Sequence, residues 1–157
     1  MKIVKELYPY VIILIVVILF RSFIATPIKV DGKSMYPTLN GNEIMILNRL
    51  GHVDRYDVVV VDEDTDDLIK RVIGLPNETI EIIDGKVYID GKKIDDPYGN
   101  GITSDYPKTK LKNNEYFVMG DNRENSRDSR SIGPIKKDDI KGTTKFVIFP
   151  FTRIGNI

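Results

Sequence analysis

The longest apolar stretch of the chain begins at its seventh residue and limits most strongly what the chain can fold into. After a short lead with three charged side chains, no charge occurs from Leu7 to Phe20, and the apolar character continues past Arg21 to Ala25. As a helix, residues 7–25 would be about 28 Å long, close to the ~30 Å of a bilayer's hydrocarbon core. We therefore expect a transmembrane anchor over residues 7–25, preceded by a short lead, residues 1–6.

A cleaved secretory signal is the alternative interpretation of this segment, because its strictly uncharged part is only 14 residues long. Residues 23–26 read Phe-Ile-Ala-Thr, a poor small-x-small cleavage site, which favours an anchor that stays in place. Basic residues on the two sides are nearly balanced, so the positive-inside rule does not set the orientation.

Composition narrows the chemistry of the remaining residues, 26–157, which suffice for one domain with its own core. Lys and Arg total 23, as do Asp and Glu, so no basic surface points to nucleic acid. The absence of cysteine excludes a thiol nucleophile, a disulfide framework and thiolate metal sites. His52 is the only histidine, and a zinc site would usually need more than one. We expect no metal and no cofactor, and the oligomeric state is not indicated.

Beyond the anchor, short segments rich in Val and Ile alternate with turn residues, a pattern typical of β-strands. The expected strands are residues 43–48, 57–61, 68–73, 79–83, 86–90, 116–119 and 143–149. Asp84-Gly85 is the strongest hairpin signal, whereas residues 96–114 read as a surface excursion. The expected fold is mostly β: one N-terminal transmembrane helix followed by a single antiparallel β-sheet or barrel-like domain.

A serine stands in a turn-like segment nine residues after the apolar segment. Gly32 lets the backbone turn there and Pro37 restricts it. By itself, Ser34 is more typical of a turn former than of a nucleophile. A serine hydroxyl also needs a base, and with one histidine the base is sought among Lys, Asp and Glu.

Lys70 is the candidate base, because it lies inside the apolar segment 68–73, where alternation directs either it or Arg71 inward. Most lysines in such strands extend their amine to solvent. If Lys70 is buried instead, desolvation lowers its pKa from about 10.4 toward neutrality. A neutral amine could then deprotonate Ser34 and afterwards protonate the leaving amine.

Polar residues are dense in residues 119–130, directly after an apolar strand. One interpretation is a solvated loop whose ion pairs contribute little. The other is a support for the site, in which Ser126 orients the Lys70 amine while Asp121, Asp128 and Arg130 brace the loop.

Taken together, these three segments resemble the bacterial type I signal peptidases, membrane-bound Ser/Lys endopeptidases, in their compact Gram-positive form. Ser34-Met35-Tyr36-Pro37-Thr38-Leu39 is similar to the family's nucleophile box, and Lys70-Arg71-Val72-Ile73-Gly74-Leu75-Pro76 to its lysine box. Residues 120–130, which read GDNRENSRDSR, are similar to its third box. The boxes follow an N-terminal anchor in the family's order.

The resemblance implies a role for each matched position. Ser34 would be the nucleophile, Lys70 the general base and Ser126 the hydroxyl that positions Lys70. The backbone N–H of Ser34 would form the oxyanion hole, and Gly32, where some members carry a serine, could add only a backbone group. The implied scaffold residues are Arg71, Asp121, Asp128 and Arg130. The implied lining of the substrate pockets is Ile28, Val30, Met35, Leu39, Leu68 and Ile69.

The implied substrates are signal-peptide-bearing preproteins, which are cut after small-x-small sites. The resemblance also implies a single-pass protein of the cell membrane. Residues 1–6 would be a short cytoplasmic lead, and the catalytic domain would lie on the extracytoplasmic side. The groove beside Ser34 is expected to bind the substrate as an added strand. Two other functions stay open: a Ser/Lys protease that cuts only itself, and a membrane-tethered, non-catalytic module for binding or assembly.

Overall fold

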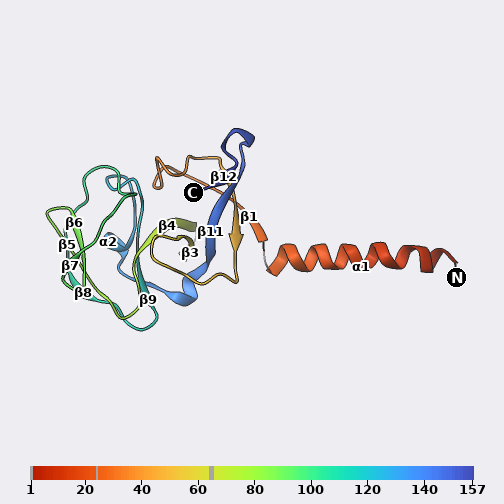
Figure 1. The fold of residues 1–157 in the computed structure, drawn as a ribbon, viewed down its shortest axis with the longest axis horizontal. Helices are drawn as coiled ribbons and strands as arrows, with labels where there is room; N and C mark the ends of the chain where they lie inside the picture. The colour runs from red at the N-terminus through yellow and green to blue at the C-terminus, as the bar shows by residue number, and fades with distance from the viewer. Residues whose placement is uncertain (1, 24, 64–65) are drawn as a thin grey trace.

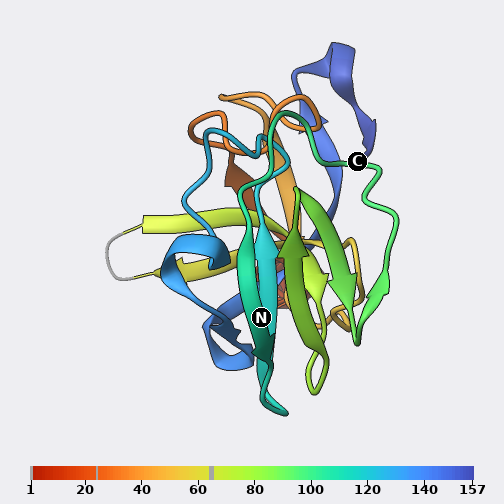
Figure 2. The same ribbon diagram turned by 90° about the vertical axis from the view of Figure 1, so that its left-hand side faces the viewer.

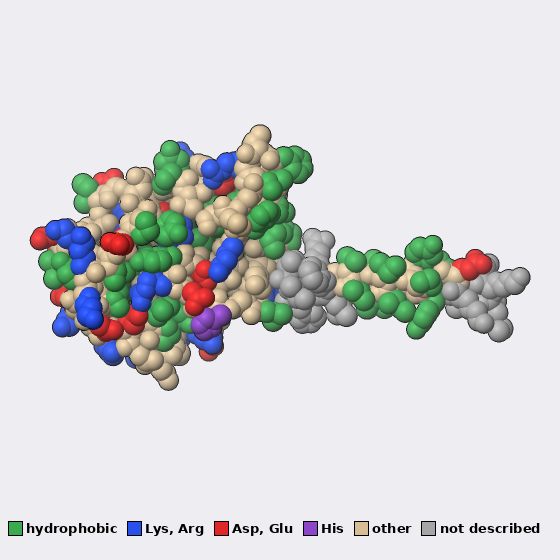
Figure 3. All heavy atoms as spheres, viewed as in Figure 1, with side chains coloured by type: hydrophobic (Ala, Val, Ile, Leu, Met, Phe, Trp, Pro, Cys, Tyr) green, Lys and Arg blue, Asp and Glu red, His purple; other side chains and the backbone are tan. Residues whose placement is uncertain are grey.

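The computed structural model describes residues 2–23, 25–63 and 66–157, with side chains described for residues 6–17, 26–63 and 66–157. The chain begins with one long helix, α1 (Lys2–Phe23), which extends away from the β domain (Figure 1). Because α1 begins at Lys2, Pro9 lies inside the helix and not in its first turn. In the described part of α1, the apolar side chains from Leu7 to Val17 are largely exposed (Figure 3).

The predicted anchor, residues 7–25, therefore coincides with most of a helix, but its residues 18–25 fall outside the described side chains. Within the part of the chain that the structure describes, no helix is both long enough and apolar enough to cross a membrane.

An eight-stranded antiparallel sheet forms the half of the domain nearer α1 (Figure 1). Its strands follow the order β1-β2-β11-β3-β4-β9-β10, and β12 pairs with β11. Their bounds are β1 Ala25–Lys29, β2 Ile44–Asn48, β3 Val58–Glu63, β4 Asp66–Gly74, β9 Glu115–Met119, β10 Ile135–Lys136, β11 Ile140–Phe149 and β12 Gly155–Asn156. The central position of β4 between β3 and β9 places the sequence around Lys70 in the middle of the sheet.

A second antiparallel sheet lies at the end of the domain remote from α1, with the order β7-β6-β5-β8 (Figure 2). Its strands are β5 Thr79–Ile83, β6 Lys86–Ile89, β7 Lys92–Lys93 and β8 Tyr106–Lys110. The predicted hairpin is confirmed: Asp84 and Gly85 both have positive φ, as the tight turn between β5 and β6 requires.

The prediction of a single sheet was wrong, because the chain leaves the first sheet after Gly74 and builds a second one. The excursion at residues 96–114 contributes to it, since β8 pairs with β5. The Tyr106 ring of β8 packs against the Phe117 ring of β9, with 4.7 Å between the ring centroids. This contact joins the second sheet to the first. One aromatic residue in a polar segment is a weak strand signal, and long-range packing decided this element.

The strand β3 shows why the core could be read from the sequence. Val58 and Val60 pack into one hydrophobic cluster and Val59 and Val61 into another, and each is at most 2% exposed. A strand that is buried on both faces needs an unbroken apolar run instead of an alternating one.

The remaining elements are short: α2 (Ser129–Ile132) and the 3₁₀ turns η1 (Lys137–Asp139) and η2 (Phe151–Arg153).

Candidate active site

Ser34 lies in the turn that joins β1 to β2. Met35 and Leu39 on its C-terminal side are buried in the core and anchor this turn. Asn122 holds the turn from the other side, because its backbone N–H donates to the Ser34 carbonyl (3.0 Å) and its side-chain amide to the Lys33 carbonyl (3.1 Å). The serine turn and the loop at residues 120–130, far apart in sequence, are therefore fastened together.

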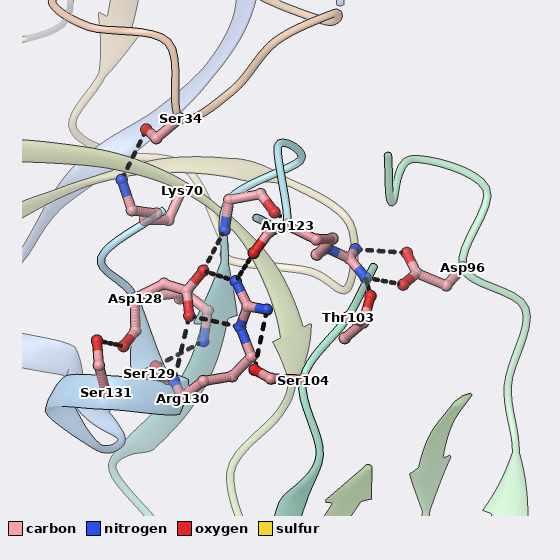
Figure 4. Close-up of polar contacts among 12 residues, drawn as sticks. Ser34, Lys70, Asp96, Thr103, Ser104, Arg123, Asp128, Ser129, Arg130 and Ser131 are labelled. Carbon is pink, nitrogen blue, oxygen red and sulfur yellow. Dashed lines mark hydrogen bonds and ion pairs between the residues drawn. The ribbon is translucent and has the colours of Figure 1, made fainter. Parts of the chain in front are cut away.

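The Lys70 side chain points at Ser34 (Figure 4). Its Nζ donates to Ser34 Oγ at 2.9 Å and to the Ile69 carbonyl at 2.9 Å, and the residue is 3% exposed. Burial lowers the pKa of Lys70 to about 8, with Arg127 acting in the same direction, while Asp128 and Glu63 oppose the shift. An amine with such a pKa is neutral in about a tenth of the molecules at pH 7 and in about half at pH 8, and the neutral form is the one that a general base requires.

Arg71, the next residue of β4, is fixed by a buried ion pair. Its Nε and Nη2 donate to the two carboxylate oxygens of Asp121 at 2.8 and 2.7 Å, and its Nη1 donates to the Tyr56 carbonyl at 2.7 Å. The Tyr98 ring covers the guanidinium, with its centroid 3.6 Å from Cζ. A bidentate pair of this kind sets the orientation of both partners, so β4 and the start of the loop share one fixed geometry.

Asp128 organises the other end of the loop (Figure 4). Its carboxylate accepts from the Gly120 N–H at 2.9 Å and from Arg130 Nε and Nη2, each at 2.9 Å. Burial by itself raises the pKa of Asp128, but the hydrogen bonds from Arg130 and from the Gly120 N–H, together with the nearby Ser126 hydroxyl, bring it below its ordinary value. The carboxylate therefore stays ionised and holds the loop closed on β9.

Ser126 lies next to Asp128 and Gly120, on the side of the site that faces Ser34. Its Oγ is buried and has no hydrogen-bond partner among the described residues, although it lies near enough to Asp128 to act on that carboxyl. A Cβ on Gly120 would lie 2.2 Å from Ser126 Oγ and 2.5 Å from the Ser34 carbonyl oxygen. Ser126 and Ser34 thus approach each other across Gly120, and the positioning of Lys70 by Ser126 stays a prediction.

The two predicted oxyanion groups differ in their availability. The Ser34 N–H has no acceptor among the described residues. Gly32 has φ +78°, in the region that favours glycine, and its N–H donates to its neighbour Asp31 at 2.9 Å. Of the two N–H groups, only that of Gly32 is engaged by an acceptor among the described residues.

Four of the six predicted pocket residues lie in the core and not on an open surface: Val30, Met35, Leu39 and Ile69. Their apolar side chains are at most 7% exposed, so in this structure they support the floor of the site and do not line an open pocket. Only Ile28 and Leu68 are half-buried. Leu68 lines an open pocket of about 520 Å³, together with Lys29, Asp31, Gly32, Asp66 and Asp67.

Sequence reasoning missed the support that the excursion gives to the loop. Asp96 pairs with the buried Arg123 guanidinium, which also donates to Thr103 (Figure 4). Tyr98 covers Arg71, as described above, and Asn100 forms backbone hydrogen bonds with Asp121 and Arg123. An isolated acid and tyrosine in a polar segment carry no sequence signal for such contacts.

Comparison with known proteins adds independent findings. The model of the family described as signal peptidase, peptidase S26, matches residues 3–149. Signal peptidase I S of Bacillus subtilis (strain 168) is 42% identical over 161 residues, covering 92% of this chain and 88% of that protein. Signal peptidase IB of Staphylococcus aureus (strain Mu50 / ATCC 700699) is 38% identical, covering 94% of this chain and 92% of that protein.

A solved structure is also similar. The crystal structure of a signal peptidase I from Enterococcus faecalis V583 at 2.27 Å resolution aligns with a TM-score of 0.54 and 29% sequence identity. The alignment covers 59% of this chain and 97% of that one.

Proposed function

This chain belongs to the signal peptidase family, peptidase S26, and removes signal peptides as a serine endopeptidase; on that premise we propose that Ser34 and Lys70 are its catalytic pair. The observation that carries the proposal is the 2.9 Å contact between a buried amine and the serine hydroxyl. Few lysines in proteins are buried without a carboxylate partner, and such an amine can act as a base near neutral pH.

In acylation, the Ser34 hydroxyl attacks the scissile carbonyl carbon and gives its proton to the neutral Lys70 amine. The Ile69 carbonyl accepts one amine N–H, which restricts the position of the amine beside the hydroxyl. The resulting ammonium then protonates the leaving amine, and the acyl-enzyme forms. In deacylation, the neutral Lys70 amine takes a proton from a water molecule that attacks the ester carbonyl. The bond from the acyl carbon to Ser34 Oγ then breaks, the Lys70 ammonium returns the proton to Ser34 Oγ, and the carboxylic acid product leaves.

The oxyanion of both steps is expected to lie at the Ser34 N–H, which no described residue accepts from. A second donor could come from Gly32 if its N–H releases the exposed Asp31 carboxylate. One oxyanion donor lowers the activation barrier by about 3 kcal/mol. Release of the Gly32 N–H from Asp31 would therefore raise the rate.

The substrate is expected to bind as an extended strand in the groove next to Ser34. Cleavage is expected after sites with small residues. Ile28 and Leu68 present the apolar surface that is accessible there. The buried side chains Val30, Met35 and Leu39 would set the depth of the pockets from below, since packed cores resist the entry of a large side chain.

We further propose that residues 7–25 anchor the chain in the cell membrane in a single pass, with residues 26–157 on the extracytoplasmic side. The support is the uncharged apolar run from Leu7 to Phe20 and the exposure of the apolar side chains from Leu7 to Val17. Exposed side chains of this kind in such a run favour a lipid environment over water.

The deciding experiment measures processing of a separate preprotein by membranes containing the wild type, Ser34→Ala or Lys70→Ala. We expect both variants to lose processing by at least about 10³-fold, with unchanged amounts of folded protein. Survival of processing in either variant would refute the pair. Cleavage of the separate preprotein by the wild type excludes a protease restricted to itself, and no cleavage by the wild type would favour a binding module.

A further inference from the structure

An ion pair connects the loop at residues 120–130 to the far end of the hairpin that carries Lys70. Arg127 Nη2 lies 2.6 Å from Glu63 Oε1, and 64 residues separate the two in sequence. Arg127 stands between Ser126 and Asp128, while Glu63 is the last residue of β3. The pair therefore fastens the segment with two of the predicted site residues to the strand that flanks β4.

The strand register places Glu63 on the same face of the hairpin as Lys70. Glu63 is opposite Asp66, Val61 opposite Leu68 and Val59 opposite Lys70. Directly paired residues of antiparallel strands project to the same side, and alternate residues share a face. Asp62, the neighbour of Glu63, belongs to the other face, and it pairs there with Lys141.

The pair is partly shielded from water on the Glu63 side. The Glu63 side chain is 19% exposed and its second oxygen, Oε2, is buried without a hydrogen-bond partner among the described residues. Arg127, at 64% exposure, supplies the compensating charge from outside. A carboxylate in this setting keeps more of its electrostatic reach than a fully hydrated one.

We propose that Arg127 and Glu63 form a positioning pair: it holds the 126–128 segment on the hairpin and keeps the charge near the Lys70 amine balanced. This proposal rests on the proposed function, in which Lys70 is the general base. Neither residue touches the reacting atoms, so both act through Lys70 and the loop.

The charges around Lys70 set the direction in which each residue of the pair shifts its pKa. Asp128 and Arg127 act on the amine from the loop, and Glu63 acts on it from β3. Glu63 raises the pKa of Lys70 and Arg127 lowers it. Removing Glu63 leaves Arg127 unopposed and lowers this pKa further, whereas removing Arg127 leaves Glu63 unopposed and raises it. Asp128 is unchanged in both cases, because Arg130 and Gly120 hold it.

The test uses the full chain with Glu63→Gln, Arg127→Gln, the double variant and Asp62→Asn as the matched control. Asp62 is a carboxylate one residue away on the opposite face, so its removal changes the same net charge without touching the pair. Two readouts are compared: the acid limb of the kcat/KM profile on a signal-peptide-bearing substrate, and the NMR titration of the Lys70 side-chain carbon next to the amine.

We expect Glu63→Gln to lower the Lys70 midpoint and Arg127→Gln to raise it, each by about 0.5 pH units at low salt, as for one partly screened charge. The double variant should return close to the wild type, Asp62→Asn should not move, and about 1 M salt should shrink both shifts. Midpoints that move in the same direction, or no further than in the control, would overturn the proposal. The NMR titration tests the pair independently of the proposed function, because it measures the pKa of Lys70 whether or not Lys70 acts as the general base.

Discussion

Lys70 and Arg71 are consecutive residues of β4 that are both buried, yet only Arg71 has a carboxylate partner. Arg71 is bound by Asp121 through two hydrogen bonds, whereas the Lys70 amine contacts a hydroxyl and a carbonyl. Of the described residues, none forms a salt bridge with Lys70. The same strand thus places one cation in a buried ion pair and leaves the other, the proposed general base, without one.

The first prediction concerns pH. Since the pKa of Lys70 is lowered to about 8, kcat/KM should fall tenfold per pH unit below about pH 8 and level off above it. The profile of the wild type on a peptide substrate checks this. Activity that keeps climbing to pH 10 would mean that the amine titrates like a hydrated lysine.

The second prediction is that Lys70→Met abolishes activity but stabilises the fold. The folded protein lowers the pKa of Lys70 from 10.5 to about 8, so below about pH 8 the buried ammonium opposes folding. The free-energy cost of burying the ammonium disappears as the pH rises from about 8 to about 10.5. In that pH window the unfolded chain binds a proton on Lys70 that the folded chain does not, so stability rises with pH. Lys70→Met should raise the free energy of unfolding at pH 7 by up to about 3 kcal/mol.

Urea denaturation at pH 7 and pH 10 measures this effect, with Lys86→Met, an exposed lysine of β6, as the control. The gain of Lys70→Met over the wild type should be larger at pH 7 than at pH 10. An equal gain at both pH values would contradict the assigned burial cost.

The third prediction is that Gly120→Ala impairs catalysis more than Ser126→Ala does. A Cβ at position 120 meets both the Ser126 side chain and the Ser34 backbone, so it must displace Ser34, the proposed nucleophile, or Ser126. Displacements of about 1 Å in an active site cost about 10²-fold in rate. Steady-state kinetics of the two variants, with circular dichroism to verify folding, decide the comparison. A fully active Gly120→Ala would show that the close approach at Gly120 does not matter.

The fourth prediction concerns Tyr98, whose ring covers the Arg71 guanidinium. Tyr98→Ala should destabilise the protein by about 1–2 kcal/mol, because the cation–π contact is lost and the buried ion pair becomes hydrated. Tyr98→Phe keeps a ring over the cation and should cost less than half as much. Thermal or chemical denaturation of both variants measures the difference, and equal losses would assign the effect to the hydroxyl group.

The strands with continuous or alternating apolar patterns were predictable, because burial on one or two faces leaves a direct mark on the residues. The segment 58–61 and the Asp84-Gly85 turn are such cases. Strands β1, β8 and β10 were not predicted, because their residues are mixed and their pairing partners lie far away in sequence. The predicted pocket residues show the same limit, since periodicity marks an apolar side chain without saying whether a core or a groove covers it.

What the sequence determined by itself is the set of reactive and apolar groups: one serine in a turn, one lysine in an apolar strand, a polar loop and a long uncharged segment. What only the tertiary structure decided is that Ser34 and Lys70 meet at 2.9 Å, that Lys70 has no salt-bridge partner among the described residues, and that Arg127 reaches Glu63. The physical reason is that pKa and reactivity depend on desolvation and on neighbours brought together by long-range strand pairing. Local sequence patterns carry no record of those distances.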